Sequence, residues 1–119
     1  MDHLGTCLKL LADETRIRIL HLLAQEPLTV AELQEILVLR QSSASSHLAK
    51  LRQAGVIDAR AEGSSHRYRL RDALEEPWAA AWAFVRQASA EDPDVGADRR
   101  LLEQLRSRRG ASWVDQVAG

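Results

Sequence analysis

The sequence predicts a mainly α-helical fold that contains one two-stranded β-hairpin. Apolar residues recur at helical spacing through the first half of the 119-residue chain. Residues 56–61 and 65–70 flank a short glycine-bearing turn, which is typical of a hairpin. The composition agrees with this fold class, because 45% of the residues are hydrophobic but only 4% are aromatic.

Three helices are predicted before residue 40. Residues 3–11 form a short helix in which leucines occupy positions i, i+4 and i+7. Asp13 is placed to cap a second helix over residues 14–25, whose broad apolar set belongs in the core. Thr29 and Glu32 form a capping box that opens the third helix.

Residues 39–51 are predicted to form a fourth helix with two different faces. Its inward stripe has i, i+3, i+4, i+7 spacing and consists of Ala44, His47, Leu48 and Leu51. We expect His47 to form a hydrogen bond within this packing. The opposite face is small, polar or basic and consists of Ser42, Ser45, Ser46, Ala49, Arg52 and Gln53. Serine favours helices poorly, but small hydroxyl side chains suit a helix that lies deep in a groove. This pattern favours a recognition helix, and a serine-rich helix facing water is the alternative.

The hairpin that follows this helix is basic. Gly55 ends the helix, and one face of the second strand then carries three arginines, Arg67, Arg69 and Arg71. Their positive charges repel one another unless an anion lies alongside. Residues 40–71 hold seven basic and two acidic side chains, although the whole chain has a net charge of −1. Because phosphate binding requires local positive charge, this hairpin is interpreted as the wing of a winged helix-turn-helix; solvated strand arginines are the alternative.

A last helix of the main domain is predicted from Pro77 to about residue 90. Two tryptophans are many for so small a core, and the helix over residues 3–11 is also unusually rich in leucine. We therefore predict that these terminal helices pair across a two-fold axis in a homodimer. The expected interface residues are Leu4, Leu8, Trp78, Trp82 and Val85. The alternative is that the tryptophans cover the core of their own chain.

The chain is expected to divide into two parts. Residues 1–90 form the winged helix-turn-helix domain for DNA binding and dimerisation. Residues 91–119 comprise an acidic linker at 91–98, a basic helix at 99–109 and, after Gly110, a tail. Because the tail contains Trp113, Val114 and Val117, it is too apolar for a purely solvated end.

Several classes of protein are disfavoured by the composition. No apolar run approaches bilayer length, and the N-terminus lacks the features of a signal peptide, so we expect no membrane partner. The single Cys7 rules out an internal disulfide and suits the cytoplasm, where we expect an inert thiol. Ser65 and His66 are adjacent in a strand and alternate faces, so they cannot converge into a catalytic site. The chain is therefore expected to be neither an enzyme nor dependent on a cofactor.

Residues 8–70 resemble the ArsR/SmtB family of bacterial winged-helix repressors. The motifs that carry the resemblance are LADETR, QSSASSHLAKLRQAGVI and HRYRL. Family members are homodimers that bind operator DNA and release it when a metal, oxidant or metabolite binds. The resemblance implies a major-groove surface consisting of Gln41, Ser42, Ser43, Ser45 and Ser46, and a wing that uses Arg67 and Arg69. Lys50 and Arg52 are interpreted as phosphate anchors, and the carboxamide of Gln41 can pair with adenine.

The chain departs from the family at the usual metal sites and at one turn. The third helix has no cysteine pair, and residues 77–90 contain no His, Cys, Asp or Glu. Because zinc-type sites need about four ligands, we expect no metal site. An N-terminal site built from His3, Cys7 and His21 is the alternative. Val38 stands at a turn position where the family often has Gly. Arg40 stands where Ser or Pro commonly begins the recognition helix of the family. These two departures concern the geometry of the turn and not the fold.

The predicted function is that of a dimeric transcriptional repressor that binds double-stranded DNA. Its release signal is unidentified, is expected to be a small molecule or metabolite, and is not expected to use the usual metal sites. Residues 98–109, DRRLLEQLRSRR, also resemble the connector of members that are fused to an S-adenosylmethionine-dependent methyltransferase domain. The alternatives are therefore the regulatory half of such a fusion, or a winged helix that binds protein.

Overall fold

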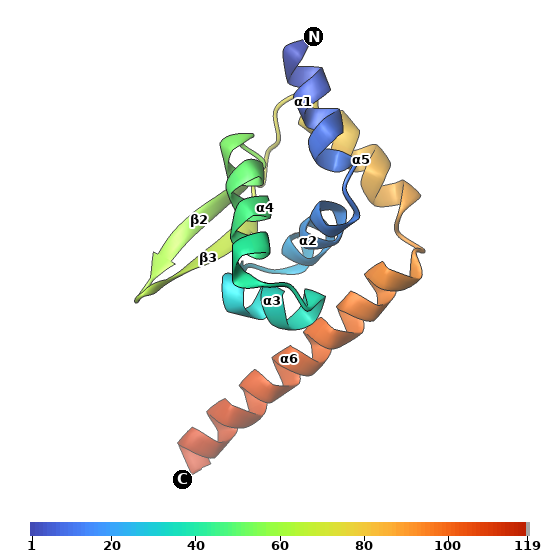
Figure 1. The fold of residues 1–119 in the computed structure, drawn as a ribbon. Coiled ribbons are helices and arrows are strands. Elements are labelled where there is room, and N and C mark those ends of the chain that lie inside the picture. Colours follow the sequence, from blue (N-terminus) through green and yellow to red (C-terminus); the bar gives the residue numbers. More distant parts are fainter. Residues whose placement is uncertain (119) are drawn as a thin grey trace.

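The computed structural model describes the backbone of residues 1–118 and the side chains of residues 1–110. It is mainly helical, with one small antiparallel sheet (Figure 1). The elements are α1 (Asp2–Leu11), α2 (Glu14–Gln25), β1 (Leu28–Thr29), α3 (Val30–Leu37), α4 (Gln41–Gln53), β2 (Ile57–Glu62), β3 (Ser65–Leu70), α5 (Trp78–Ala88) and α6 (Pro93–Ala118). The predicted mainly α fold with a β-hairpin is confirmed.

The predicted helix caps are present. The side chain of Asp13 accepts a hydrogen bond from the Arg16 backbone N–H at 3.0 Å and so begins α2. In the capping box of α3, the Glu32 N–H donates to Thr29 Oγ1 at 3.2 Å, and the Thr29 N–H donates to Glu32 Oε1 at 2.9 Å. These local bonds fix the residues at which α2 and α3 begin.

Val38 ends α3 in the left-handed conformation, with φ 54° and ψ 56°. Glycine adopts this conformation easily, whereas a β-branched side chain is strained there. The turn between α3 and α4 therefore keeps the geometry that glycine normally provides, although valine occupies the position.

Both ends of α4 connect it closely to its neighbours. Leu33 on α3 and Leu48 and Leu51 on α4 are buried in the same core cluster. After α4, the Gly55 N–H donates to the Arg52 carbonyl at 3.0 Å and the Val56 N–H donates to the Leu51 carbonyl at 3.2 Å. This is a Schellman motif, and the positive φ of 78° at its centre favours glycine. The wing therefore starts at a defined place beside the end of α4.

The sheet has three strands in the order β1-β3-β2, one more than the predicted hairpin. β1 has only two residues, Leu28 and Thr29, which pair with Tyr68 and Arg67 of β3. Such a short strand carries no alternating pattern, so sequence periodicity could not reveal it. β1 attaches the wing to the start of α3, because it pairs with β3 and directly precedes that helix.

α5 packs on α1 and α2 (Figure 1). Trp78 and Trp82 lie in the core of their own chain, with 7% and 4% of their surfaces exposed. They therefore cover the core of their own chain, which was the alternative to a place in the dimer interface. The Trp82 ring instead stacks edge-on against His21, with ring centroids 5.1 Å apart.

The predicted acidic linker at residues 91–98 is wrong for most of its length, because α6 begins at Pro93. Proline suits the first turn of a helix, and the Asp94 N–H donates to Asp92 Oδ1 at 2.9 Å. Asp98 is buried and forms a bidentate ion pair with Arg18 of α2, at 2.8 Å for both hydrogen bonds. That partner lies far away in the sequence, so the acidic run was mistaken for a solvated connector.

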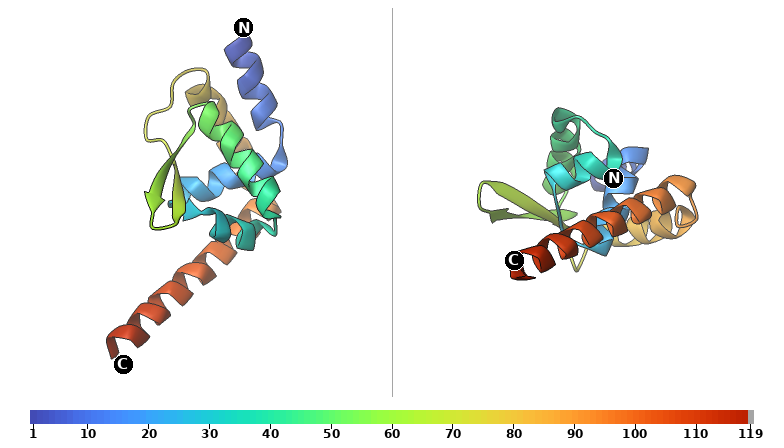
Figure 2. Two further views of the ribbon diagram at one scale, coloured as in Figure 1. Left: turned by 60° about the vertical axis from the view of Figure 1, so that its left-hand side comes forward. Right: turned by 90° about the horizontal axis from the view of Figure 1, so that it is seen from below.

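α6 packs on α2 and α3 and then extends past them (Figure 2). It continues through Gly110, where the tail was predicted to begin, because one glycine costs a helix only about 1 kcal/mol. The side chains of Trp113, Val114 and Val117 lie outside the described residues. Within the described backbone, no helix is both long and apolar enough to cross a membrane.

Candidate nucleic-acid interface

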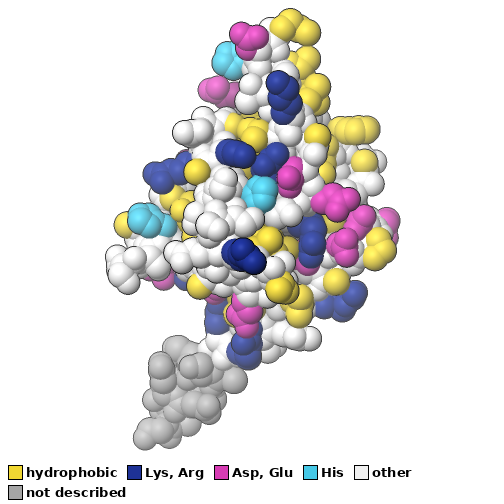
Figure 3. Space-filling model, viewed as in Figure 1, with side chains coloured by type: hydrophobic (Ala, Val, Ile, Leu, Met, Phe, Trp, Pro, Cys, Tyr) yellow, Lys and Arg dark blue, Asp and Glu magenta, His cyan; other side chains and the backbone are white. Residues whose placement is uncertain are grey.

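The polar face of α4 is exposed, as the sequence predicted. Exposed residues on this helix are Gln41, Ser42, Ser45, Ser46, Ala49, Lys50, Arg52 and Gln53. Ser43 is half-buried, and Ala44, Leu48 and Leu51 are buried. α4 has no acidic residue. In Figure 3 acidic side chains gather near the connection of α5 to α6, whereas polar and basic ones dominate the α4 side.

His47 fastens the inner side of α4 to the end of α1. Its Nδ1 lies 3.1 Å from Arg16 Nη1, and Arg16 Nε donates to the Leu10 carbonyl at 2.7 Å. A guanidinium can only donate, so His47 Nδ1 is the acceptor and the ring is neutral in this bond. Burial lowers the pKa of His47, which favours the same neutral state. His47 therefore hydrogen-bonds within the helix packing, as expected.

Arg67 is held in the middle of the wing hairpin. Its Nε donates to Glu62 Oε2 at 2.7 Å, and its Nη1 lies 3.3 Å from both the Pro27 carbonyl and Glu32 Oε1. The hydrogen bond that Arg67 donates to Glu62 is the largest cause of the raised pKa of Arg67. Arg67 is therefore engaged by its own chain, whereas the sequence predicted that it would contact DNA.

The other wing arginines also have acidic neighbours. Arg69 Nη2 lies 3.9 Å from Asp58 Oδ2 and 4.0 Å from Asp72 Oδ2, and Arg71 Nε lies 3.9 Å from Asp58 Oδ2. The sequence predicted that these guanidinium groups would repel one another unless an anion lay alongside, and Asp58 and Asp72 are such anions. Carboxylates of the same chain provide the negative charge, although Arg69 and Arg71 stay exposed at distances that give weak pairing.

Arg60 was missed in the sequence analysis. It lies on β2 directly opposite Arg67, is exposed, and has no ion pair among the described side chains. Opposite residues in an antiparallel pair share a face, so the register places Arg60 on the arginine face. The alternation of Asp58 and Arg60 in the first strand was the available signal, but only the second strand was considered.

A surface groove separates α4 from the wing. One hollow of about 410 Å³ is lined by Ser45, Ala49, Arg52, Gln53 and Tyr68. A second hollow of about 460 Å³ is lined by Arg52, Asp58, Ala59, Arg60 and Arg69. Arg52 lines both hollows, so the groove runs between the exposed face of α4 and the arginines of the wing.

The expected dimer residues differ in their surroundings. Leu4 and Leu8 are exposed on α1, Val85 is half-buried on α5, and Trp78 and Trp82 are buried as described above. Phe84, which sequence analysis missed because it lies off the predicted apolar face, is 73% exposed. The apolar surface of α1 and α5 is thus carried mainly by leucines and a phenylalanine.

Three candidate ligands of an N-terminal metal site have separate surroundings. His3 is exposed, Cys7 is buried with its pKa raised by burial, and His21 Nε2 lies 2.7 Å from Ser89 Oγ. Among residues 1–110, no group of three or more His, Cys, Asp or Glu side chains is placed to hold a metal ion.

The model of the family described as "Bacterial regulatory protein, arsR family" matches residues 13–59. The chain is 48% identical over 63 residues to the arsenic resistance transcriptional regulator ArsR1 of Pseudomonas putida, covering 52% of this chain and 49% of that protein. It is 42% identical over 62 residues to the regulator KmtR of Mycobacterium tuberculosis, covering 52% and 48%. The chain thus spans about half the length of these relatives.

Solved structures extend the similarity. HlyU from Vibrio cholerae is 31% identical, with a TM-score of 0.64, over 76% of this chain and 95% of that one. A fragment of Mb0332 from Mycobacterium bovis is 30% identical, with a TM-score of 0.62, over 77% and 82%. That fragment is described as a homodimeric winged helix-turn-helix DNA-binding domain and a possible ArsR-family regulator. The predicted winged helix-turn-helix fold is therefore confirmed.

Proposed function

The chain belongs to the arsR family of bacterial regulatory proteins, and we propose that it is a homodimeric repressor whose α4 and wing bind operator DNA. This is a family of transcription regulators and not of enzymes, in agreement with the sequence-based expectation. The alternative of a methyltransferase regulatory half gains no support from the relatives described above.

One observation carries this proposal: α4 exposes a polar face without any carboxylate, beside a groove that contains Arg52 and Arg60. Carboxylates on such a face would be repelled by phosphate, and bulky side chains would hold the helix away from the bases. Small hydroxyl groups allow close approach to the floor of a major groove.

Each exposed side chain has a proposed role. Gln41 contacts a base at the start of the helix, together with the hydroxyl groups of Ser42, Ser45 and Ser46. Ser43, which is half-buried, contributes less than the resemblance implied. Phosphate contacts come from Lys50, Arg52, Arg60 and Arg69. Arg67 supports the wing through its hydrogen bonds to Glu62 and Glu32.

Dimerisation is proposed through α1 and α5, by the exposed Leu4, Leu8 and Phe84. The Mycobacterium bovis relative is described as homodimeric, which supports this arrangement. In such a dimer the two copies of α4 would enter successive major grooves, about 34–36 Å apart. We further propose that the release signal is a small molecule or metabolite that does not use the usual metal sites, because α5 carries no metal-binding side chain.

A fluorescence-anisotropy titration tests the proposed function. The full chain is titrated with a duplex from the region upstream of its own gene and with a scrambled duplex of equal length. We expect preference for the upstream duplex and a loss of affinity of about 10³-fold or more between about 50 and 200 mM salt. Gln41→Ala should reduce the preference about tenfold. Ser46→Ala removes another proposed base contact on the same face and should also reduce the preference. Equal affinity for both duplexes in the unmodified chain contradicts the proposal.

A further inference from the structure

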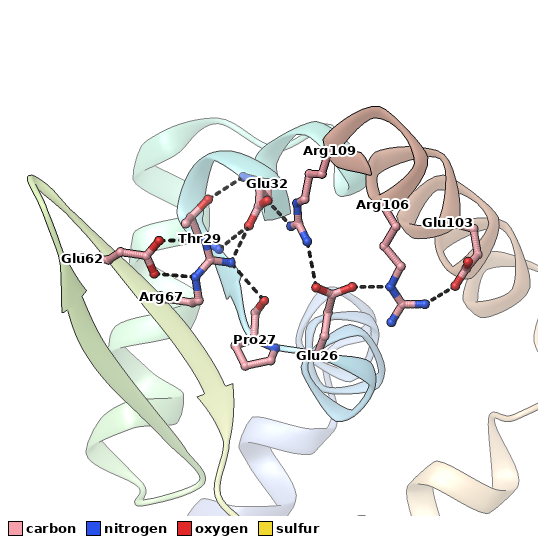
Figure 4. A network of polar contacts seen from close by, with 9 residues as sticks. All are labelled: Glu26, Pro27, Thr29, Glu32, Glu62, Arg67, Glu103, Arg106 and Arg109. Carbon is pink, nitrogen blue, oxygen red and sulfur yellow. Dashed lines mark hydrogen bonds and ion pairs between the residues drawn. The ribbon is translucent and has the colours of Figure 1, made fainter. Parts of the chain in front are cut away.

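A carboxylate at the start of α3 connects the wing to the C-terminal helix. Glu32 Oε1 accepts hydrogen bonds from the Thr29 N–H at 2.9 Å and from Arg67 Nη1 at 3.3 Å (Figure 4). Glu32 Oε2 accepts one from Arg109 Nη2 of α6. The carboxylate that caps α3 therefore also binds one guanidinium of β3 and one of α6.

Arg109 is itself shared between two carboxylates. Its Nη1 donates to Glu26 Oε2 at 2.8 Å, while Arg106 of the same helix donates to Glu26 Oε1 (Figure 4). The Glu26 and Glu32 side chains are only 19% and 16% exposed. Burial alone would raise the pKa of Glu26, but hydrogen bonds from Arg109 and Arg106 outweigh it, and the pKa is lowered. Glu26 is thus charged, and Arg109 lies between its carboxylate and that of Glu32.

We propose that α6 positions the wing: Arg109 holds the Glu32 carboxylate in place, and that carboxylate holds Arg67 in the middle of β3. This role of Arg109 was hidden in the sequence, because its partners lie 77 and 83 residues away. The effect of this positioning on DNA binding rests on the proposed function, whereas its effect on the wing of the free protein does not.

The chemistry of the shared Glu32 carboxylate explains why the loss of Arg109 should loosen the wing. Without Arg109, Glu26 and Glu32 would face each other across the α2–α3 junction without the cation that bridges them. A poorly compensated, largely buried carboxylate turns toward solvent, and its bond to Arg67 then weakens. Arg67 pairs with Thr29 in the register of β3 and β1, so that strand pairing is the part of the wing that loosens.

Hydrogen exchange of the free, full-length chain tests this coupling. In Arg109→Ala we expect the backbone amides of β3 to exchange roughly two- to fivefold faster, relative to core amides of α2 in the same sample. Arg108→Ala is the matched control. Arg108 lies next to Arg109 in α6 but, among the described side chains, pairs with the exposed Glu35 alone, so its removal deletes the same charge without touching Glu32.

A second variant separates wing positioning from helix capping. Glu32→Gln keeps an oxygen that caps α3 but removes the charge that binds both arginines. We expect faster exchange in β3 for Glu32→Gln alone, and no further acceleration when Arg109→Ala is added. A full additional effect of Arg109→Ala in that background means that Arg109 does not act through Glu32, and overturns the proposal.

The remaining outcomes are also decisive. If Arg109→Ala and Arg108→Ala change β3 exchange equally, or if neither changes it, α6 does not position the wing. If Arg109→Ala loosens the wing, its affinity for the upstream duplex is compared with that of Arg108→Ala. A greater loss in Arg109→Ala supports both proposals. Equal affinities uphold the positioning role but contradict a role of the wing in DNA binding.

Discussion

Arginines that look alike in the sequence have very different surroundings in the wing. Arg67 donates to two glutamates and a backbone carbonyl, Arg69 lies at the limit of ion-pair distance from two aspartates, and Arg60 has no ion pair among the described side chains. A guanidinium already bound by carboxylates has little attraction left for phosphate. The exposed, unpaired Arg60 is therefore the wing side chain best suited to contact DNA.

Arg60→Ala is expected to weaken binding to upstream and scrambled duplexes about equally. Because one phosphate contact is lost, the slope of log affinity against log salt should fall by about 1. Anisotropy titrations at several salt concentrations measure both quantities. Arg67→Ala is the matched variant on the opposite strand, and it should instead lower the free energy of unfolding, by about 1 kcal/mol. An unchanged salt slope in Arg60→Ala excludes its proposed phosphate contact.

The bond between His47 and Arg16 makes stability depend on pH. Because burial lowers the pKa of His47, the unfolded chain takes up this proton at a higher pH than the folded chain does. The contribution of neutral His47 is fully present above about pH 6.5 and is lost as the pH falls below that value. Burial also lowers the pKa of His21, which adds in the same direction.

His47→Gln should reduce this pH dependence, because a carboxamide oxygen can accept from Arg16 but does not titrate. The difference in melting temperature between about pH 7.5 and about pH 5.5 is expected to be smaller in the variant than in the unmodified chain. His66→Gln is the control, since His66 lies exposed on the wing. An equal pH dependence in His47→Gln and the unmodified chain would show that His47 does not stabilise the fold in its neutral form.

Elements whose signals are local were predicted well, and elements that depend on distant partners were not. The capping box of Thr29 and Glu32 and the turn at Gly55 follow from a few neighbouring residues, and both are present. The burial of Asp98 in α6 depends on its ion pair with Arg18, which spans 80 residues. A run of acidic residues has the same appearance whether it is solvated or paired across the fold.

In the candidate interface, too, local signals were predicted and long-range partners were not. Periodicity was sufficient to identify the exposed serines of α4, because one helix face is defined by the helix itself. The partners of Arg67 come from α3, from β2 and from the residue before β1, and the burial of the tryptophans depends on how α5 lies against α2. No spacing within one element contains that information.

The turn between α3 and α4 gives a prediction about stability. Val38 adopts φ 54°, a conformation that strains a β-branched residue. It gains little from burial, because it is 87% exposed. Val38→Gly should raise the free energy of unfolding by about 1 kcal/mol, because the relief of backbone strain outweighs the greater entropy of glycine in the unfolded chain. Val38→Ala, which keeps a Cβ, should gain less. Chemical denaturation measures both, and a less stable Val38→Gly variant contradicts the argument.

For the whole molecule, the account requires a two-fold dimer that presents two α4–wing units to one DNA duplex. The exposed apolar side chains of α1 and α5 are proposed to form its interface, with Leu8 53% exposed. Leu8→Glu should shift the chain from dimer to monomer in sedimentation velocity, because two glutamates would meet near the two-fold axis. Leu101→Glu, on α6, should leave the dimer intact. A monomeric unmodified chain, or a dimer unaffected by Leu8→Glu, rejects this interface.

Hydroxyl-radical footprinting on the upstream duplex tests the central claim most directly, since it reports where the two units lie on DNA. The account predicts two protected segments, related by two-fold symmetry and about one helical turn apart, roughly 10–10.5 base pairs. Both segments should disappear in Leu8→Glu. A single protected segment, or uniform weak protection along the duplex, would contradict the claim that paired α4 helices read DNA.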